Sequence, residues 1–305
     1  MQKLRIKTRA KINLFLNVLY KRPDGYHEIE TVFQSIGLAD DIILRKLSRG
    51  IEIKCDHPQV PSDESNLAYR AAELFFKISK LSEGVEITIE KRIPVAAGLG
   101  GGSADAAGVL VGLNRLFELG YEREQLMRLG AKLGADVPFC ILGGTALGRG
   151  IGEILTPLPP LGKIWLVIVN PGFTVSTASV YQNLPACISN FVHTNSQNKN
   201  FGLTKCPKNV NILIQHIRAD NLPKICPEMF NALETVVVNR YPVTRRLKNQ
   251  LKEFGALSTL MSGSGPTVFA LMPDEFHAKS AAGKLSAETP FCIATTTSPV
   301  GVTIL

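Results

Sequence analysis

Apolar and polar residues alternate over the first twenty positions of the chain. Residues 6, 8, 10, 12, 14, 16 and 18 form one set, and between them stand the polar residues Lys7, Arg9, Lys11, Asn13 and Asn17. A period of two is typical of a strand that buries one face. We therefore expect a strand over residues 6–18, with Lys11 and Asn13 about 7 Å apart on its polar face.

Hydrophobic spacing divides the rest of the chain into further elements. Period-two or short apolar runs predict strands over residues 28–36, 51–55, 85–89 and 165–169. Helical spacing predicts helices from residue 66, over 103–118 and 122–133, around residue 180 and over 229–238. Because these elements mix without strict alternation, an α+β fold is favoured. The proline-dense stretch 156–162 suggests a junction between two domains, 1–160 and 161–305.

Composition narrows the possible partners. The chain has 305 residues and a formal charge of +8, which suits an anionic ligand. It lacks a basic run interleaved with aromatic residues, so we expect no nucleic-acid partner. An apolar run of the roughly 20 residues that a membrane span needs is also absent, so we expect no membrane association. The six cysteines form no C-x-x-C pair, which predicts a cytoplasmic protein without a disulfide framework, a zinc site or other metal ligands of its own.

The strongest chemical signal is the segment 94–107, Pro-Val-Ala-Ala-Gly-Leu-Gly-Gly-Gly-Ser-Ala-Asp-Ala-Ala. A strand leads into a glycine run that opens onto a helix. Glycines without Cβ atoms let backbone N–H groups approach phosphate oxygens, and the helix N-terminus adds its dipole. Ser103 is placed to cap this helix or to bind a phosphate or its metal ion. Neither a Walker loop nor the Rossmann spacing fits, since no Gly-Lys-Ser/Thr follows and Ser103 stands three positions after Gly100.

Three other motifs each allow two interpretations. Asp136 precedes Val-Pro, which predicts a helix N-cap and leaves a catalytic carboxylate open. Tyr26 and His27 follow the turn Pro-Asp-Gly, where they pack a hairpin corner or stack on a base and read its edge. The segment 262–267, Ser-Gly-Ser-Gly-Pro-Thr, is a hairpin turn or a second wall beside the first glycine loop.

Taken in order, Lys11 and the segments 94–107, 135–138 and 262–267 resemble the motifs of the GHMP kinases. Within that superfamily, Lys-Ile-Asn-Leu from residue 11 and Lys-Arg-Pro-Asp-Gly-Tyr-His from residue 21 resemble signatures of the kinases that act on 4-diphosphocytidyl-2-C-methyl-D-erythritol. The resemblance implies a two-domain fold with the active site in the cleft between the domains. It also implies ATP-dependent phosphorylation of the 2-hydroxyl of that cytidine diphosphate substrate in non-mevalonate isoprenoid synthesis, with Mg²⁺ between the β and γ phosphates.

The resemblance also assigns roles to residues. Asp136 matches the catalytic base and Lys11 the lysine paired with it. The positions that match substrate contacts are Asn13, Tyr26, His27, Thr177 and Tyr181, with the two tyrosines sandwiching cytosine and His27 recognising its edge. The positions that match the ATP loop are Pro94, Val95, Ala96, Ala97, Gly98, Leu99, Gly100, Gly101, Gly102, Ser103 and Ala104. Family members commonly carry a second serine where this chain has Ala104, so only the backbone of Ala104 is retained in the loop. The segment 186–211 matches no signature.

Three alternatives remain open at this stage. Another GHMP kinase, of the mevalonate or homoserine type, would keep the phosphate loop without needing Tyr26 and His27. A basic RNA-binding protein would have no use for Asp136 opposite a glycine loop, and its affinity would fall steeply with salt. An inactive regulator would have no need of Lys11 and Asp136. The sequence gives no oligomeric state.

Overall fold

The computed structural model describes residues 3–192 and 208–305 of the chain. In this part of the chain, eight strands form one sheet and four strands form another. The strands of the first sheet are β1 (Lys3–Lys21), β2 (His27–Leu47), β3 (Ile51–Cys55), β4 (Gly84–Glu90), β5 (Thr145–Arg149), β6 (Ile154–Pro157), β8 (Phe230–Asn231) and β12 (Val302–Ile304). The strands of the second sheet are β7 (Trp165–Asn170), β9 (Ser258–Met261), β10 (Val268–Met272) and β11 (Phe291–Thr296).

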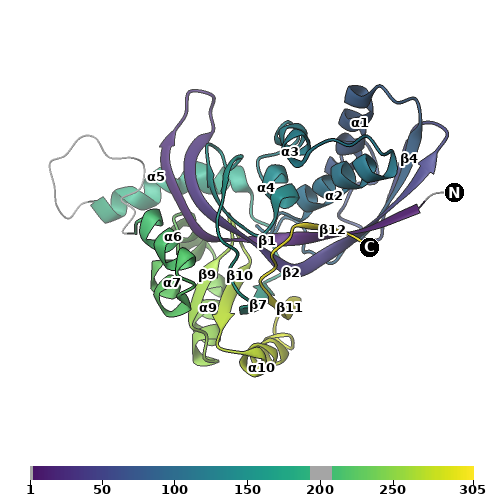
Figure 1. Ribbon diagram of the computed structural model, residues 1–305. Coiled ribbons are helices and arrows are strands. Elements are labelled where there is room, and N and C mark those ends of the chain that lie inside the picture. Colours follow the sequence, from purple (N-terminus) through teal and green to yellow (C-terminus); the bar gives the residue numbers. More distant parts are fainter. Residues whose placement is uncertain (1–2, 193–207) are drawn as a thin grey trace.

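The helices gather in two groups around these sheets. Those beside the first sheet are α1 (Leu67–Ser79), α2 (Gly101–Leu116), α3 (Arg123–Ala131) and α4 (Val137–Leu142). Those that follow β7 are α5 (Thr177–Val192), α6 (Val210–Arg218), α7 (Leu222–Glu228), α8 (Glu234–Arg240), α9 (Pro242–Glu253) and α10 (Glu275–Leu285). Figure 1 shows α1 to α4 on one side of the long β1–β2 hairpin and the second sheet with α9 and α10 on the other. The predicted α+β class is confirmed.

The β1–β2 hairpin is longer than the alternation predicts. The two strands pair from Lys3↔Arg45 to Lys21↔His27, with register shifts at three places along β1. Such irregularities bend and twist a strand pair, and the hairpin curves visibly in Figure 1. The alternating pattern stops at Ala10, and every residue from there to Val18 is buried because the second face of β1 is also covered. Lys11 and Asn13 therefore lie inside the molecule, not on a solvated strand face.

Helix α2 packs closely on the hairpin. A Cβ atom added to Gly108 would lie 2.2 Å from Cγ2 of Thr8, and one added to Gly112 would lie 2.2 Å from Cδ1 of Ile6. Only glycine allows this approach of helix to strand. The helix begins at Gly101, two residues before the predicted start, because Gly100 takes a φ of 71° and turns the chain into the helix. Ser103 consequently lies in the first turn and does not cap it.

The C-terminal half departs from the prediction in one further element. The predicted helix over residues 229–238 is confirmed only in its second half, since Phe230 and Asn231 form the short strand β8 parallel to β1, and α8 starts only at Glu234. Residues 193–207 of the segment without a signature lie outside the described residues.

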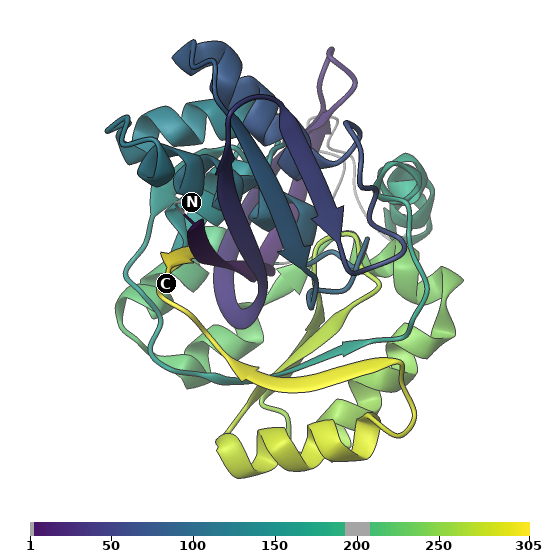
Figure 2. The same ribbon diagram turned by 90° about the vertical axis from the view of Figure 1, so that its right-hand side faces the viewer.

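The last strand, β12, returns to the first sheet and pairs with β1. The C-terminal strand consequently lies beside the first residues of β1 in Figures 1 and 2, where the yellow C-terminal segment runs from the second sheet to the first. The domain boundary at residues 160/161 stays a prediction.

Residues 3–192 and 208–305 contain neither a membrane-spanning helix nor a cluster of metal-binding side chains, and the cysteines described there are unpaired. No helix there has the length and apolar character to cross a membrane. Among the same described residues, no group of three or more His, Cys, Asp or Glu side chains is placed to hold a metal ion. Cys55, Cys140, Cys226 and Cys292 carry free thiols. Burial raises the pKa of the Cys140 thiol, so this group stays protonated beside the candidate site.

Candidate active site

A pocket of about 990 Å³ collects residues from both halves of the chain. Of the residues predicted from the sequence, those that line it are Lys11, Asn13, Tyr26, His27, Pro94, Val95, Ala96, Ala97, Gly98, Gly100, Gly101, Gly102, Ser103, Asp136, Thr177 and Tyr181. Two predicted residues point elsewhere. Leu99 and Ala104 are buried in the main core, and the N–H of Ala104 donates to the carbonyl of Gly100 at 2.8 Å.

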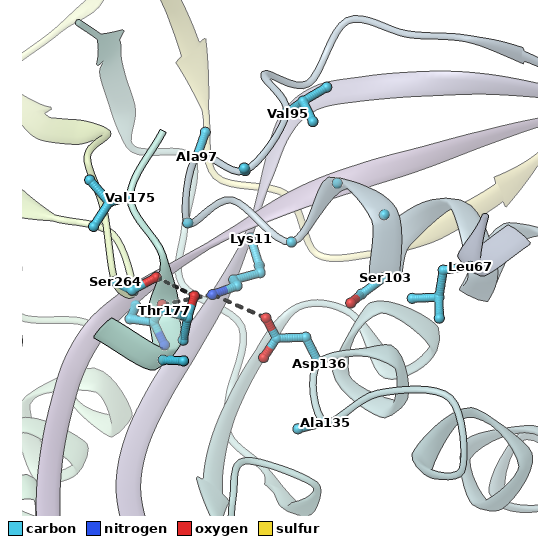
Figure 3. A pocket seen from close by; sticks show the side chains of 18 of the residues that line it. Lys11, Leu67, Val95, Ala97, Ser103, Ala135, Asp136, Val175, Thr177 and Ser264 are labelled. Atoms are coloured by element: carbon cyan, nitrogen blue, oxygen red, sulfur yellow. Dashed lines mark hydrogen bonds and ion pairs between the residues drawn. The ribbon is translucent and has the colours of Figure 1, made fainter. Parts of the chain in front are cut away.

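Lys11 and Asp136 form an ion pair in the middle of this pocket. Nζ of Lys11 lies 3.3 Å from Oδ2 of Asp136, and Figure 3 shows the two side chains pointing toward each other. Lys11 is only 4% exposed. The carboxylate of Asp136 is partly open to the pocket. A buried ammonium beside a more accessible carboxylate leaves the carboxylate free to meet a ligand.

The position of Asp136 at the start of α4 does not serve as a side-chain cap. Asp136 is the N-cap residue of this helix, with Pro138 in the first turn as the sequence predicts. Its side chain nevertheless makes no capping hydrogen bond. The helix start therefore places the carboxylate in the pocket, while the capping function that the motif suggested is not used.

A chain of hydrogen bonds also holds the ammonium group of Lys11. The ammonium donates to Oδ1 of Asn13 at 2.9 Å, and the amide of Asn13 donates to Oγ1 of Thr31 at 2.8 Å. Thr31 in turn donates to the carbonyl of Phe15 at 2.6 Å. Each of these groups is buried and has a partner, as buried polar groups require. The bulged part of β1 thus sets the direction of the Lys11 side chain.

Residues 94–104, predicted from the sequence to be a phosphate loop, lie against this pair. The backbone N–H of Lys11 donates to the carbonyl of Leu99 at 2.9 Å. A Cβ atom on Gly100 would lie 3.0 Å from Cγ of Lys11 and 3.7 Å from Oδ2 of Asp136. The N-terminus of α2 follows at once, and its free N–H groups form a site for anions. The hydroxyl of Ser103, which makes no hydrogen bond within the described residues, lies on the pocket wall.

The second glycine loop, residues 262–265, forms the opposite wall. Oγ of Ser262 donates to the carbonyl of Gly98 at 2.9 Å, so the two loops are in direct contact. A Cβ atom on Gly263 would lie 3.4 Å from Nζ of Lys11 and from Oδ1 of Asn13. Both interpretations of this motif are confirmed, since residues 262–267 connect the antiparallel strands β9 and β10 and the same loop also forms a wall of the pocket.

A buried charge cluster lies behind the phosphate loop. Nζ of Lys91 contacts Oδ2 of Asp40 at 2.5 Å and Oδ2 of Asp105 at 2.7 Å. Burial, together with the charge of the neighbouring Asp40, raises the pKa of Asp105 to about 7 against the opposing charge of Lys91. A Cβ atom on Gly101 would lie 2.9 Å from Nζ of Lys91, so the cluster supports the start of α2.

Asp105 gives a prediction about stability against pH. A carboxyl group whose pKa is higher in the folded chain stabilises the fold most at low pH, and this contribution is lost as the pH rises through the folded pKa. Replacing Asp105 by asparagine removes this dependence of folding stability on pH, because asparagine does not titrate. The melting temperature of Asp105→Asn relative to the original chain should therefore increase from about pH 5 to about pH 8. A difference that is constant with pH would contradict the raised pKa.

Aromatic groups occupy the end of the pocket formed by the hairpin and α5. The rings of His27 and Tyr181 stack with centroids 4.9 Å apart and planes at 25°. Burial, helped by the charge of Lys21, lowers the pKa of His27, so its ring is neutral near pH 7. Burial also raises the pKa of Tyr181. Tyr26 lines the same pocket but is 61% exposed.

Several residues that line the pocket belong to no motif in the sequence. Asn66 and Leu67 were recognised only as a helix start, and Asn66 indeed caps α1 by accepting from the N–H of Ala68 at 2.9 Å. Others are Val60, Pro61 and Lys91. Their only signal was position, because loops before a helix and beside a glycine motif often line sites.

Three kinds of chemical group follow one another along the pocket. An anion-binding loop lies at one end, the Lys11–Asp136 pair in the middle and a set of flat rings at the other end. This order suits transfer of a phosphoryl group from a nucleotide to an alcohol, since phosphoryl transfer depends on positioning and charge stabilisation.

Comparison with known proteins assigns the family. The family model "GHMP kinases N terminal domain" matches residues 66–144, and "GHMP kinases C terminal" matches residues 213–290. The 4-diphosphocytidyl-2-C-methyl-D-erythritol kinase of Alkaliphilus metalliredigens is 46% identical over 94% of this chain and 94% of its own length. The chain belongs to this family of GHMP kinases.

Solved structures agree with the assignment. A crystal structure of 4-(cytidine 5'-diphospho)-2C-methyl-D-erythritol kinase matches this GHMP kinase with a TM-score of 0.78 and 35% identity, over 96% of this chain and 99% of the other. Homoserine kinase from Cytophaga hutchinsonii matches with a TM-score of 0.75 at 18% identity, over 100% of this chain and 98% of the other, which shows the shared fold alone. The enzyme is an ATP-dependent kinase, so the RNA-binding alternative is set aside.

Proposed function

We propose that this kinase transfers the γ-phosphoryl group of ATP to the 2-hydroxyl of 4-diphosphocytidyl-2-C-methyl-D-erythritol, a step of non-mevalonate isoprenoid synthesis in the cytoplasm. The observation that carries the proposal is a single pocket with the phosphate loop at one end and Tyr26, His27 and Tyr181 at the other. The Lys11–Asp136 pair lies between them. The names of the relatives support this substrate. The free thiols of the described cysteines support a location in the cytoplasm.

Asp136 acts as the general base in this proposal. Its carboxylate takes the proton of the 2-hydroxyl while the oxygen forms its bond to the γ-phosphorus and the bond from that phosphorus to the β,γ-bridging oxygen breaks, releasing ADP. Lys11, held by Asn13 at 2.9 Å, stabilises the negative charge that develops on the attacking oxygen. The loop contacts keep both groups close to the transferred phosphoryl group.

Mg²⁺ fits this site as a partner of the nucleotide. Magnesium is commonly held by one or two protein oxygens together with substrate phosphates. The Ser103 hydroxyl, without a partner in the described residues, would offer such an oxygen. The ion would supply positive charge against the phosphates of the nucleotide.

The purine of ATP has a place beyond the phosphate loop. The apolar residues Val60, Pro61, Leu67, Pro94 and Val95 line the pocket, and in this proposal they accommodate the purine. Their apolar surfaces suit the flat faces of a purine.

A parallel substrate screen tests the function. ADP release is followed with 4-diphosphocytidyl-2-C-methyl-D-erythritol, mevalonate and homoserine at matched concentrations. We expect turnover of the first compound only. Faster turnover of mevalonate or homoserine would replace the proposal by another activity of the same superfamily, and absence of turnover with all three would favour an inactive regulator.

Replacing Gly102 by valine should weaken ATP binding without disturbing the fold. A Cβ atom there would contact no other protein atom within 4 Å, and Gly102 lines the pocket. The side chain therefore projects into the space where phosphates bind, and we expect KM for ATP to rise roughly tenfold, about 1.4 kcal/mol. Binding of the cytidyl substrate in calorimetry should persist.

Gly283 provides a matched control for this substitution. It lies within α10, and a Cβ atom added there also meets nothing within 4 Å. Gly283→Val should leave both KM values unchanged. If the two substitutions changed KM for ATP equally, Gly102 would not be part of the ATP site. Gly101 is unsuitable for this test, because its added Cβ would lie 3.0 Å from Cγ2 of Ile93.

A further inference from the structure

The 262–265 loop carries two serines whose hydroxyls reach opposite parts of the site. Ser262 donates to the carbonyl of Gly98 in the phosphate loop at 2.9 Å. Oγ of Ser264 lies 2.8 Å from Oγ1 of Thr177, the first residue of α5. Figure 3 shows the Ser264–Thr177 pair beside Lys11 and Asp136. One loop thus contacts the ATP side through one serine and the substrate side through the other.

The backbone of this loop is held from behind, so the two contacts have fixed positions. The buried amide of Asn231 donates to the carbonyls of Met261 at 2.7 Å and Gly263 at 2.8 Å. The N–H of Ser262 donates to the carbonyl of Thr267 at 2.9 Å. Because β8, which contains Asn231, pairs with β1, the loop is tied to the strand that carries Lys11.

Ser262 can act on ligands only through the phosphate loop. Its side chain is fully buried and does not line the pocket. Gly98, its acceptor, has a φ of 77°, and an added Cβ there would lie 2.2 Å from the carbonyl oxygen of Ser262. The contact between the two loops is therefore close, and the Ser262 hydroxyl holds Gly98 in this conformation.

Ser264 acts on the substrate side of the pocket. It is 8% exposed and lines the pocket together with Thr177. Two hydroxyls carry two hydrogens, of which one lies between them, so the second remains available to an acceptor on a bound substrate. Thr177 and Tyr181 are four residues apart on α5 and share one helix face. The Ser264 contact consequently sets both the Thr177 hydroxyl and the start of the helix that presents Tyr181.

We propose that Ser264 is a positioning residue for the phosphoryl acceptor, acting through Thr177 and the first turn of α5, while Ser262 serves the ATP side of the same loop. The inference rests on the proposed function, because it takes the acceptor to be the cytidine diphosphate substrate. It assigns one serine of the loop to each substrate.

Steady-state kinetics of Ser264→Ala and Ser262→Ala provide the test. Loss of a hydrogen bond worth about 0.5–1.5 kcal/mol corresponds to roughly a two- to twelvefold change. Ser264→Ala should raise KM for 4-diphosphocytidyl-2-C-methyl-D-erythritol by about that factor and leave KM for ATP within about twofold. Ser262→Ala should do the reverse. Ser264→Thr, which keeps the hydroxyl, should restore the KM of the cytidyl substrate.

The possible outcomes distinguish a failure of the role of Ser264 from a failure of the proposed function. Equal shifts of both KM values in the two alanine variants, or failure of Ser264→Thr to restore the lost affinity, would overturn the role of Ser264. Calorimetric titration with cytidine diphosphate gives a second readout that does not require turnover, and weaker binding is expected in Ser264→Ala only. If the original enzyme neither binds cytidine diphosphate nor turns over the cytidyl substrate, the proposed function itself fails.

Discussion

Asp136→Asn is expected to lower kcat by roughly 10²–10⁴-fold, the usual contribution of a general base. Asparagine keeps the size of the side chain but cannot accept the proton of the 2-hydroxyl. The partner of Asp136, Nζ of Lys11 at 3.3 Å, would still find an amide oxygen, so KM values should change little. Purified protein assayed by ADP release under saturating substrates measures the effect.

The structure removes the main objection to this experiment, which is a loss of stability at the helix start. The Asp136 side chain makes no capping bond, so its replacement costs α4 no capping interaction. Asp274 is a suitable control, because its carboxylate does cap α10 by accepting from the N–H of His277 at 2.9 Å. Asp274→Asn should leave kcat unchanged. Turnover of Asp136→Asn within about threefold of the original enzyme would show that the carboxylate is not the base.

Local patterns predicted the loops of this site but not the way they meet. The glycine run at 98–102 predicts an anion site because the need for positive φ and close approach is written in the residue types themselves. The pairing of Lys11 with Asp136 depends instead on the bulged register of β1 and on the close packing of α2 at Gly108 and Gly112. No local pattern encodes such a long-range distance.

Two groups of polar residues are buried although the sequence did not predict their burial. Alternation predicted a solvated face for Lys11 and Asn13, whereas both are buried and linked by a hydrogen bond of 2.9 Å. The Asp40–Lys91–Asp105 cluster had no sequence signal, because its members belong to β2, the segment after β4 and α2. Charges so far apart in sequence are indistinguishable from surface charges until the fold brings them together.

The base end of the pocket shows what the motif left undetermined. In the structure, His27 stacks on Tyr181 with centroids 4.9 Å apart. A base sandwiched between two rings needs about twice the stacking distance, roughly 7 Å, so cytosine does not fit between these two as they lie. A sandwich between Tyr26 and Tyr181 stays a prediction, and it requires the His27 ring to leave the face of Tyr181 that the base occupies.

Tyr26→Ala and Tyr181→Ala should each raise KM for the cytidyl substrate roughly five- to 150-fold, since stacking of a base on an aromatic ring is worth about 1–3 kcal/mol. KM for ATP should barely move. The 61% exposure of Tyr26 makes its substitution especially clean, because a packed hairpin corner would bury the ring and lose stability on truncation. The melting temperature of Tyr26→Ala is therefore expected to stay unchanged.

Tyr20 is the matched control, an aromatic residue on the same hairpin that is 52% exposed and does not line the pocket. Tyr20→Ala should change neither KM value. An unchanged cytidyl KM in both Tyr26→Ala and Tyr181→Ala would refute a base site at this end of the pocket and leave only a kinase of the wider superfamily.

His27→Ala should in addition weaken discrimination between cytidine and uridine analogues. The lowered pKa keeps the ring neutral near pH 7, so it presents one donor and one acceptor nitrogen to the edge of a base. Cytosine and uracil differ at that edge, and a group that pairs with one of them rejects the other because a polar atom would remain unpaired. Ratios of kcat/KM for the two analogues measure the effect. A ratio equal to that of the original enzyme would assign the ring to packing against Tyr181 alone.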